Sequence, residues 1–121
     1  MDVRLTDKQA KVLIEALDLY SRVGMQQLEA VGTAMQWNFG YDVDIEKEIA
    51  GIKVKLGQPV NGSWGIASPK VHDKAKIAYD AECVIRQNIA KRESHPKYSV
   101  WHRNPMHIGS EPLLTIIGNG T

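Results

Sequence analysis

The residues best suited to bind a ligand lie in the last third of the chain. Five basic residues fall between positions 86 and 103, with only Glu93 opposing them: Arg86, Lys91, Arg92, Lys97 and Arg103. Guanidinium groups bind phosphate through paired hydrogen bonds, and aromatic faces stack on nucleotide bases. Because Tyr98 and Trp101 are interleaved with these cations, the pattern predicts a site for a small anion of the nucleotide type.

The segment from Trp101 to Glu111 is the densest in side chains used for recognition, and Pro105 and Pro112 restrict its backbone. Loops that carry such groups on a rigid scaffold are common binding sites. The alternative is a segment that covers the core, with Trp101 filling it. The residues predicted to contact a ligand are Trp64, Tyr79, Arg86, Tyr98, Trp101, His102, Arg103, His107, Ser110 and Glu111.

Simpler interpretations exist for several of these residues. Lys91 and Arg92 suit the negative end of a helix, and Arg86 follows Glu82 by four residues, which is the spacing of an ordinary helix-surface pair. Trp64 lies in a glycine-rich loop over 57–72. It either anchors that loop on the core, which we favour because an exposed indole is costly, or presents a binding face.

Catalytic and metal-binding patterns are missing from the sequence. There is no glycine-rich phosphate loop, nucleophile elbow or zinc-protease motif. Cys83 falls beside an apolar helix stripe, which favours a buried structural thiol over a nucleophile. The histidines at 72, 95, 102 and 107 match no regular ligand spacing. We therefore predict a non-enzymatic protein with no cofactor and no metal.

Composition predicts one domain over residues 1–121. The formal net charge of +1 argues against a general nucleic-acid-binding protein, which is usually strongly basic. A single cysteine excludes an internal disulfide. No stretch approaches the ~20 apolar residues of a membrane span, and the first eight residues lack a signal-peptide core. The expected location is the cytoplasm, without membrane contact.

Periodicity predicts about four helices. The first begins after Thr6, which forms a capping box with Gln9, and Gly24 bends or ends it. The second runs over about 25–35. The third begins after Asp44, its N-cap, and ends at Gly57. Its apolar face is formed by Ile45, Ile49, Ile52 and Leu56, and Lys53 is expected on the solvated side. The fourth covers about 73–92, capped by Asp73.

Three short segments alternate in the manner of strands: 2–5, 98–102 and 113–117. The fold class predicted is therefore α+β, mostly helical with a small antiparallel sheet. The first helix is apolar on more than one side, and in so small a chain the surplus is expected to be buried between subunits. A homo-oligomer is the corresponding prediction.

Several runs resemble a group of small proteins of tailed phages and prophages that carries no established activity. The similar pieces cover about two thirds of the chain: Gly62 to Pro69, Ala78-Tyr79-Asp80, Val84-Ile85-Arg86, Ser110-Glu111-Pro112-Leu113 and Leu17 to Met25. The resemblance implies a phage origin and expression in the cytoplasm of a bacterial host. It assigns no catalytic residue.

The function expected is that of a phage accessory protein that acts by binding, with sequestration of a nucleotide-type signal against a host defence pathway as its specific form. Arg86 and Arg103 would hold phosphate, and Trp101 and His102 would contact the base. The alternatives are a protein inhibitor of a host enzyme, which would use the same surface, and a weak nucleic-acid-binding module.

Overall fold

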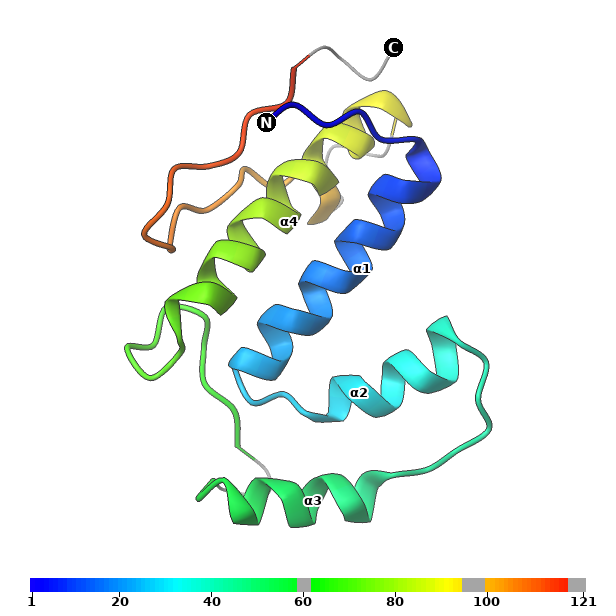
Figure 1. Ribbon diagram of the computed structural model, residues 1–121, viewed down its shortest axis with the longest axis vertical. Coiled ribbons are helices and arrows are strands. Elements are labelled where there is room, and N and C mark those ends of the chain that lie inside the picture. The colour runs from blue at the N-terminus through cyan, green and yellow to red at the C-terminus, as the bar shows by residue number, and fades with distance from the viewer. Residues whose placement is uncertain (59–61, 95–99, 118–121) are drawn as a thin grey trace.

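The computed structural model describes residues 1–58, 62–94 and 100–117 of the chain, and Figure 1 shows their arrangement. In order, the elements are α1 (Asp7–Gly24), α2 (Glu29–Thr33), the π-helical turn η1 (Ala34–Asn38), α3 (Glu46–Lys55), α4 (Asp73–Arg92) and the 3-10 turn η2 (Val100–His102). None of the helices in these ranges is long and apolar enough to cross a membrane.

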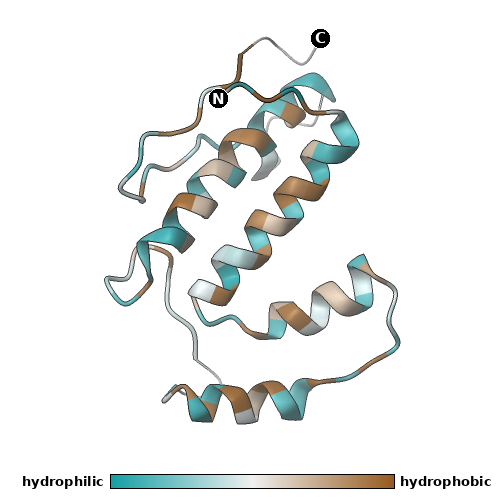
Figure 2. Ribbon diagram, in the orientation of Figure 1, coloured by the Kyte–Doolittle hydropathy of each residue, from teal (hydrophilic) through white to brown (hydrophobic). Residues whose placement is uncertain are grey.

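The long helices α1 and α4 pack side by side and run in opposite directions (Figure 1). This antiparallel pair is called the hairpin here, although α2 and α3 lie between the two helices in the sequence. Apolar and polar positions alternate along both helices, as Figure 2 shows. Ala10 and Ile14 of α1 meet Ile85 and Ile89 of α4 in one buried cluster, and Leu17 and Trp101 pack against it. Burial of this cluster supplies the main driving force for the pairing of the two helices.

On α4, Ile85 and Ile89 belong to the face that helical spacing predicts. On α1, the spacing of Val12, Leu13, Ala16, Leu17 and Tyr20 predicts a different face from the observed one. Val12, Leu13 and Tyr20 are exposed, and Ile14 is buried.

Two contacts, a capping box and an ion pair, stabilise the end of the hairpin where α1 begins. Thr6 Oγ1 accepts from the Gln9 amide at 3.1 Å, and the Thr6 amide donates to Gln9 Oε1 at 2.9 Å, so the predicted capping box is present. Arg92 Nη2 lies 2.8 Å from Asp7 Oδ1. Arg92 thus joins the last turn of α4 to the first turn of α1.

A second buried cluster closes the other end of the hairpin. Met25, Val71 and Ala75 form it, and Trp64 and Ile66 pack against it. The Trp64 amide donates to the Met25 carbonyl at 2.9 Å. The anchoring interpretation of Trp64 is therefore the one that the structure shows, and the residues after 62 form a loop fixed to α1.

The second predicted helix begins later than its sequence suggests. Gln26 has a left-handed φ of 65°, which interrupts the helix that was expected from Met25. Helical structure resumes at Glu29 as α2 and continues through the π-helical turn of η1. The predicted boundaries of 25–35 are therefore shifted toward the C-terminus.

The third helix has the predicted range but not the predicted buried face. Ile49 is buried, whereas Ile52 and Leu56 are 47% and 56% exposed. Lys53, which we expected in solvent, is only 2% exposed, and its Nζ donates to Glu29 Oε1 at 2.7 Å and to the Gly62 carbonyl at 3.0 Å. A buried ammonium group with oxygen partners holds α3 against α2.

The predicted α+β class is wrong: the described residues form helices and no strand. Residues 2–5 and 113–117 are extended without a strand partner, and residues 100–102 form η2. Residues 98 and 99 lie outside the described residues. Alternation over four or five residues fits any extended chain that lies on a surface. Here the three successive amides of residues 108–110 bond carboxylates of α4 instead of a neighbouring strand.

The close approach of α1 and α4 at Gly24 yields a stability prediction. A Cβ at Gly24 would lie 2.3 Å from the Ala75 Cβ, so Gly24→Ala must push the helices apart. We expect a loss of about 1–3 kcal/mol in the free energy of unfolding, measured by urea titration. The matched control is Gly51→Ala in α3, where nothing lies within 4 Å and where alanine should stabilise by about 0.5–1 kcal/mol. Equal effects of the two substitutions would contradict this packing.

Candidate functional site

The described part of the C-terminal segment, residues 100–117, is called the tail here, and carboxylates of α4 hold it. Asp80 is 4% exposed, and its Oδ2 accepts from the Ile108 amide at 2.9 Å and from the Gly109 amide at 2.8 Å. Two turns nearer the start of α4, Asp73 accepts from the Ser110 amide at 2.9 Å and from the Ser110 hydroxyl. These bonds lower the pKa of the Asp73 carboxyl below its usual value.

A glycine is required where the tail crosses α4. A Cβ at Gly109 would lie 2.9 Å from both the backbone nitrogen and Cγ1 of Ile77. Further along, Gln87 Nε2 donates to Asn104 Oδ1 at 3.2 Å and to the His102 carbonyl at 3.4 Å. The tail is thereby attached to α4 over several helical turns, and its side chains have defined positions.

This attachment brings three of the predicted site residues together, and we call Tyr79, Arg86 and Arg103 the basic face. Burial raises the pKa of the Tyr79 hydroxyl, Cys83 adds to that rise, and the guanidinium groups of Arg86 and Arg103 act in the opposite direction. Both guanidinium groups are therefore close enough to Tyr79 to act on its charge. The Tyr79 hydroxyl also lies 4.0 Å from Met106 Sδ.

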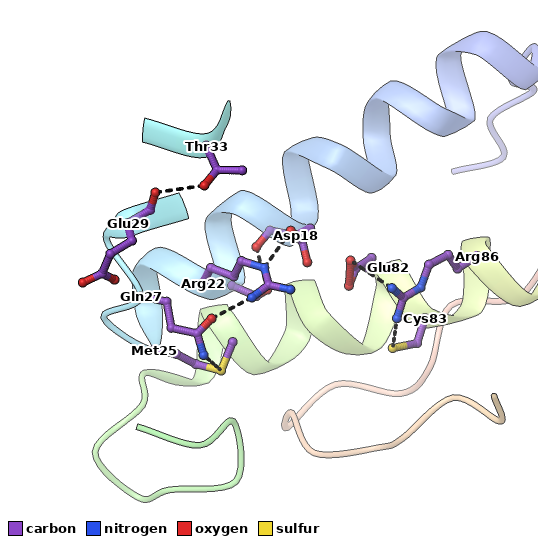
Figure 3. Close-up of polar contacts among 10 residues, drawn as sticks. Asp18, Arg22, Met25, Gln27, Glu29, Thr33, Glu82, Cys83 and Arg86 are labelled. Carbon is purple, nitrogen blue, oxygen red and sulfur yellow. Dashed lines mark hydrogen bonds and ion pairs between the residues drawn. The ribbon is translucent and has the colours of Figure 1, made fainter. Parts of the chain in front are cut away.

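The Arg86 guanidinium has only long contacts with its neighbours. Nη2 lies 3.8 Å from Cys83 Sγ, Nη1 lies 4.0 Å from Glu82 Oε1, and Nε is buried without an acceptor among the described residues (Figure 3). Its side chain is 22% exposed. Arg103 is exposed and has no ion-pair partner in the described part of the chain. The guanidinium groups of the basic face thus have N–H donors that could bind an oxyanion.

Glu82 is the buried carboxyl group nearest to Arg86, and it compensates that charge only in part. It is 1% exposed, lies between α4 and α1 on the side of Asp18 (Figure 3), and has no hydrogen-bond donor within the described residues. Burial raises the pKa of Glu82 to about 7; Arg86 opposes the rise, and Asp18 adds to it. Near neutral pH the carboxyl is therefore partly protonated.

The remaining predicted site residues lie apart from the basic face. Trp64 belongs to the second buried cluster, where Lys70 Nζ lies 5.6 Å from its ring. Trp101 packs against the α1–α4 cluster, as in the alternative of a core cover. His107 Nε2 donates to the Glu111 carbonyl at 2.7 Å, and the Ser110 hydroxyl bonds Asp73. Tyr98 lies outside the described residues.

The histidines that raised the question of a metal are dispersed. His72 is the N-cap of α4, a role predicted for Asp73: its Nδ1 accepts from the Lys74 amide at 3.1 Å. The His102 carbonyl accepts from Gln87 of α4, His107 bonds the Glu111 carbonyl, and His95 lies outside the described residues. Within ranges 1–58, 62–94 and 100–117, no group of three or more His, Cys, Asp or Glu is placed to hold a metal ion.

Sequence reasoning missed a groove of about 480 Å³ between α1 and α2–η1. Glu15, Asp18 and Glu29 give it an acidic lining, and Arg22 bonds Asp18 and Gln27 inside it (Figure 3). The groove exists because α2 turns away from α1 after Gln26. No periodic pattern marks that turn, although Gly24 signals a break nearby. Its charge does not suit an anion.

Comparison of the chain with protein-family models, with curated proteins and with solved structures found no match.

The tail anchor makes one prediction. Asp80→Ala removes the acceptor of the Ile108 and Gly109 amides, so the tail should detach locally from α4. We expect faster hydrogen exchange at those two amides and a loss of about 1–3 kcal/mol in the free energy of unfolding. Asp2→Ala, at an exposed position of the N-terminal arm, is the control. Unchanged exchange at Ile108 and Gly109 would show that Asp80 does not hold the tail.

Glu82 makes a prediction about pH. Its pKa is about 7 in the folded chain and near 4.5 in the unfolded chain. Between these two pH values the unfolded chain loses its proton more readily, so the free energy of unfolding falls as pH rises from 4.5 to about 7 and changes no further above that range. In Glu82→Gln this part of the pH dependence should disappear, and above about pH 7 the variant should be more stable by about 1–3 kcal/mol. Urea titrations across the pH range measure it. Parallel curves for the two proteins would contradict the assignment.

Proposed function

We propose that this protein is a non-enzymatic binding protein that captures a small phosphate-bearing molecule of the nucleotide type at the basic face. The observation that carries the proposal is the state of Arg86. Its guanidinium is mostly buried, its contacts are 3.8 Å and longer, and its Nε has no acceptor in the described part of the chain. A buried guanidinium in this condition is stabilised by an anion that accepts two of its hydrogen bonds.

Arg103 and Tyr79 extend the same face. Arg103 sits on the anchored tail, so its backbone is held in place before any ligand arrives. That arrangement lowers the entropy that binding must overcome. Tyr79 offers a hydroxyl donor and an aromatic ring beside the two guanidinium groups. Stacking of a base on Trp101 is not part of the proposal, because that indole packs against the core.

The biological setting proposed follows the resemblance to phage proteins. A small phage accessory protein in the cytoplasm of a bacterial host would bind a signal nucleotide of a defence pathway and withdraw it from its receptor. Such a protein needs affinity and abundance and no turnover. Cys83, the one cysteine of the chain, is buried, and burial raises the pKa of its thiol, which does not favour a thiolate nucleophile.

The test is a thermal-shift series against mononucleotides, cyclic nucleotides and inorganic phosphate. A true ligand stabilises the folded state by mass action, by about 2.7 kcal/mol at a hundred times its dissociation constant. We expect Arg103→Ala to abolish the shift. Arg86→Lys, which keeps the charge but loses the planar fork, should weaken binding about tenfold or more. Arg4→Ala, in the exposed N-terminal arm, is the matched control.

Two other outcomes would replace the proposal. Binding of single-stranded DNA that weakens steeply with salt would favour a nucleic-acid-binding module. No stabilisation by any of these compounds would contradict anion capture and favour inhibition of a host protein.

A further inference from the structure

Aromatic side chains gather at the end of η1, at a place that neither the basic face nor the core uses. Trp37, Phe39 and Tyr41, here called the aromatic segment, are 81%, 69% and 59% exposed. Leaving three large aromatic side chains in water is unfavourable, and aromatic residues of this kind are the usual anchors of protein interfaces. Asp42 and Asp44 follow directly, so the segment is both apolar and acidic.

A groove of complementary character lies where α1 ends and α4 begins. It has a volume of about 320 Å³ and a mostly apolar surface, and its lining residues are Tyr20, Val23, Gly24, His72, Lys74 and Ala75. We call it the α1–α4 groove. Tyr20 and Val23 are 53% and 40% exposed, so its apolar wall is open to solvent. Lys74 and His72 supply a basic rim.

The size of the groove suits an aromatic side chain. A dry cavity of about 150 Å³ already accommodates benzene, so a groove of 320 Å³ has room for the two rings of an indole. An occupant that is apolar at its tip and acidic behind it would match both the wall and the rim.

The chain's own aromatic segment is not in position to fill the groove. α2 and η1 lead away from the end of α1, and the chain between η1 and α3 lies on the opposite side of the molecule from the start of α4 (Figure 1). A second copy presents the same segment without that restriction. A two-fold pair that fills both grooves requires the segment and the groove of each copy to face the same partner, and the contact is then closed.

We propose that the protein is a homodimer in which the aromatic segment of each copy docks in the α1–α4 groove of the other. Trp37 enters the groove against Tyr20 and Val23, and Asp42 lies against Lys74. Charge complementarity selects the occupant, because an acidic, aromatic segment matches a basic, apolar groove of the same chain. The proposal does not depend on nucleotide capture, since the two surfaces share no residue.

Sedimentation equilibrium over a wide concentration range tests the proposal, with helicity measured by circular dichroism for each variant. The wild-type chain should have twice its 13.5 kDa mass. Trp37→Ser and Val23→Asp should each raise the dissociation constant about 30-fold or more, the effect of losing a central anchor. Val54→Ser removes an apolar side chain that is 62% exposed on α3 and outside the interface. It should leave the mass unchanged.

Two further variants test the pairing itself. Asp42→Lys and Lys74→Glu should each weaken the dimer, and the double variant should recover it. A mixture of Trp37→Ser and Val23→Asp chains should form a pair, because that pair retains one intact segment in one intact groove. A wild-type chain that stays monomeric would overturn the proposal, as would a dimer that Trp37→Ser and Val23→Asp leave intact.

Discussion

The bonds between the Asp80 carboxylate and two successive amides of the tail decide where the candidate site residues of the tail lie. A carboxylate that is 4% exposed is costly unless donors surround it, and the amides of Ile108 and Gly109 supply them. Because Gly109 has no Cβ, the backbone can approach Ile77 closely enough for these bonds to form. The tail then follows α4, which brings the Arg103 guanidinium close enough to Tyr79 to lower its pKa, as the Arg86 guanidinium also does. Without this attachment, the basic face would be a lone arginine on a helix.

The two long helices could be predicted from the sequence because their signals are local. The capping box at Thr6 and the apolar spacing of α1 and α4 act over one or two turns, and the structure has both helices within a residue of the predicted bounds. The bounds of α2 and the buried face of α3 were harder to predict because their environment is set by residues distant in sequence. Lys53 is buried by Glu29 and the Gly62 carbonyl, and nothing in the spacing of α3 distinguishes it from its solvated neighbours.

The sheet was predicted wrongly for a related reason. Alternation tells which side chains face opposite ways but not which groups accept the backbone hydrogen bonds, and in the tail several of these acceptors are side chains of α4. The candidate site was predicted in part. Basic and aromatic residues close together in sequence pointed to the tail, yet Trp101 packs against the core while Arg103 is exposed. Such a division depends on the path of the chain, which composition does not determine.

The way α3 is attached has a consequence for how the molecule opens. Its one buried apolar side chain is Ile49, and its strongest link to α2 is the ammonium group of Lys53. The hairpin of α1 and α4 depends mainly on apolar burial, which weakens on cooling, whereas a hydrogen-bonded ion pair responds differently to temperature. We therefore expect α3 to open separately from the pair of α1 and α4. The carboxylates that hold the tail, Asp73 and Asp80, belong to α4, so their bonds do not depend on α3.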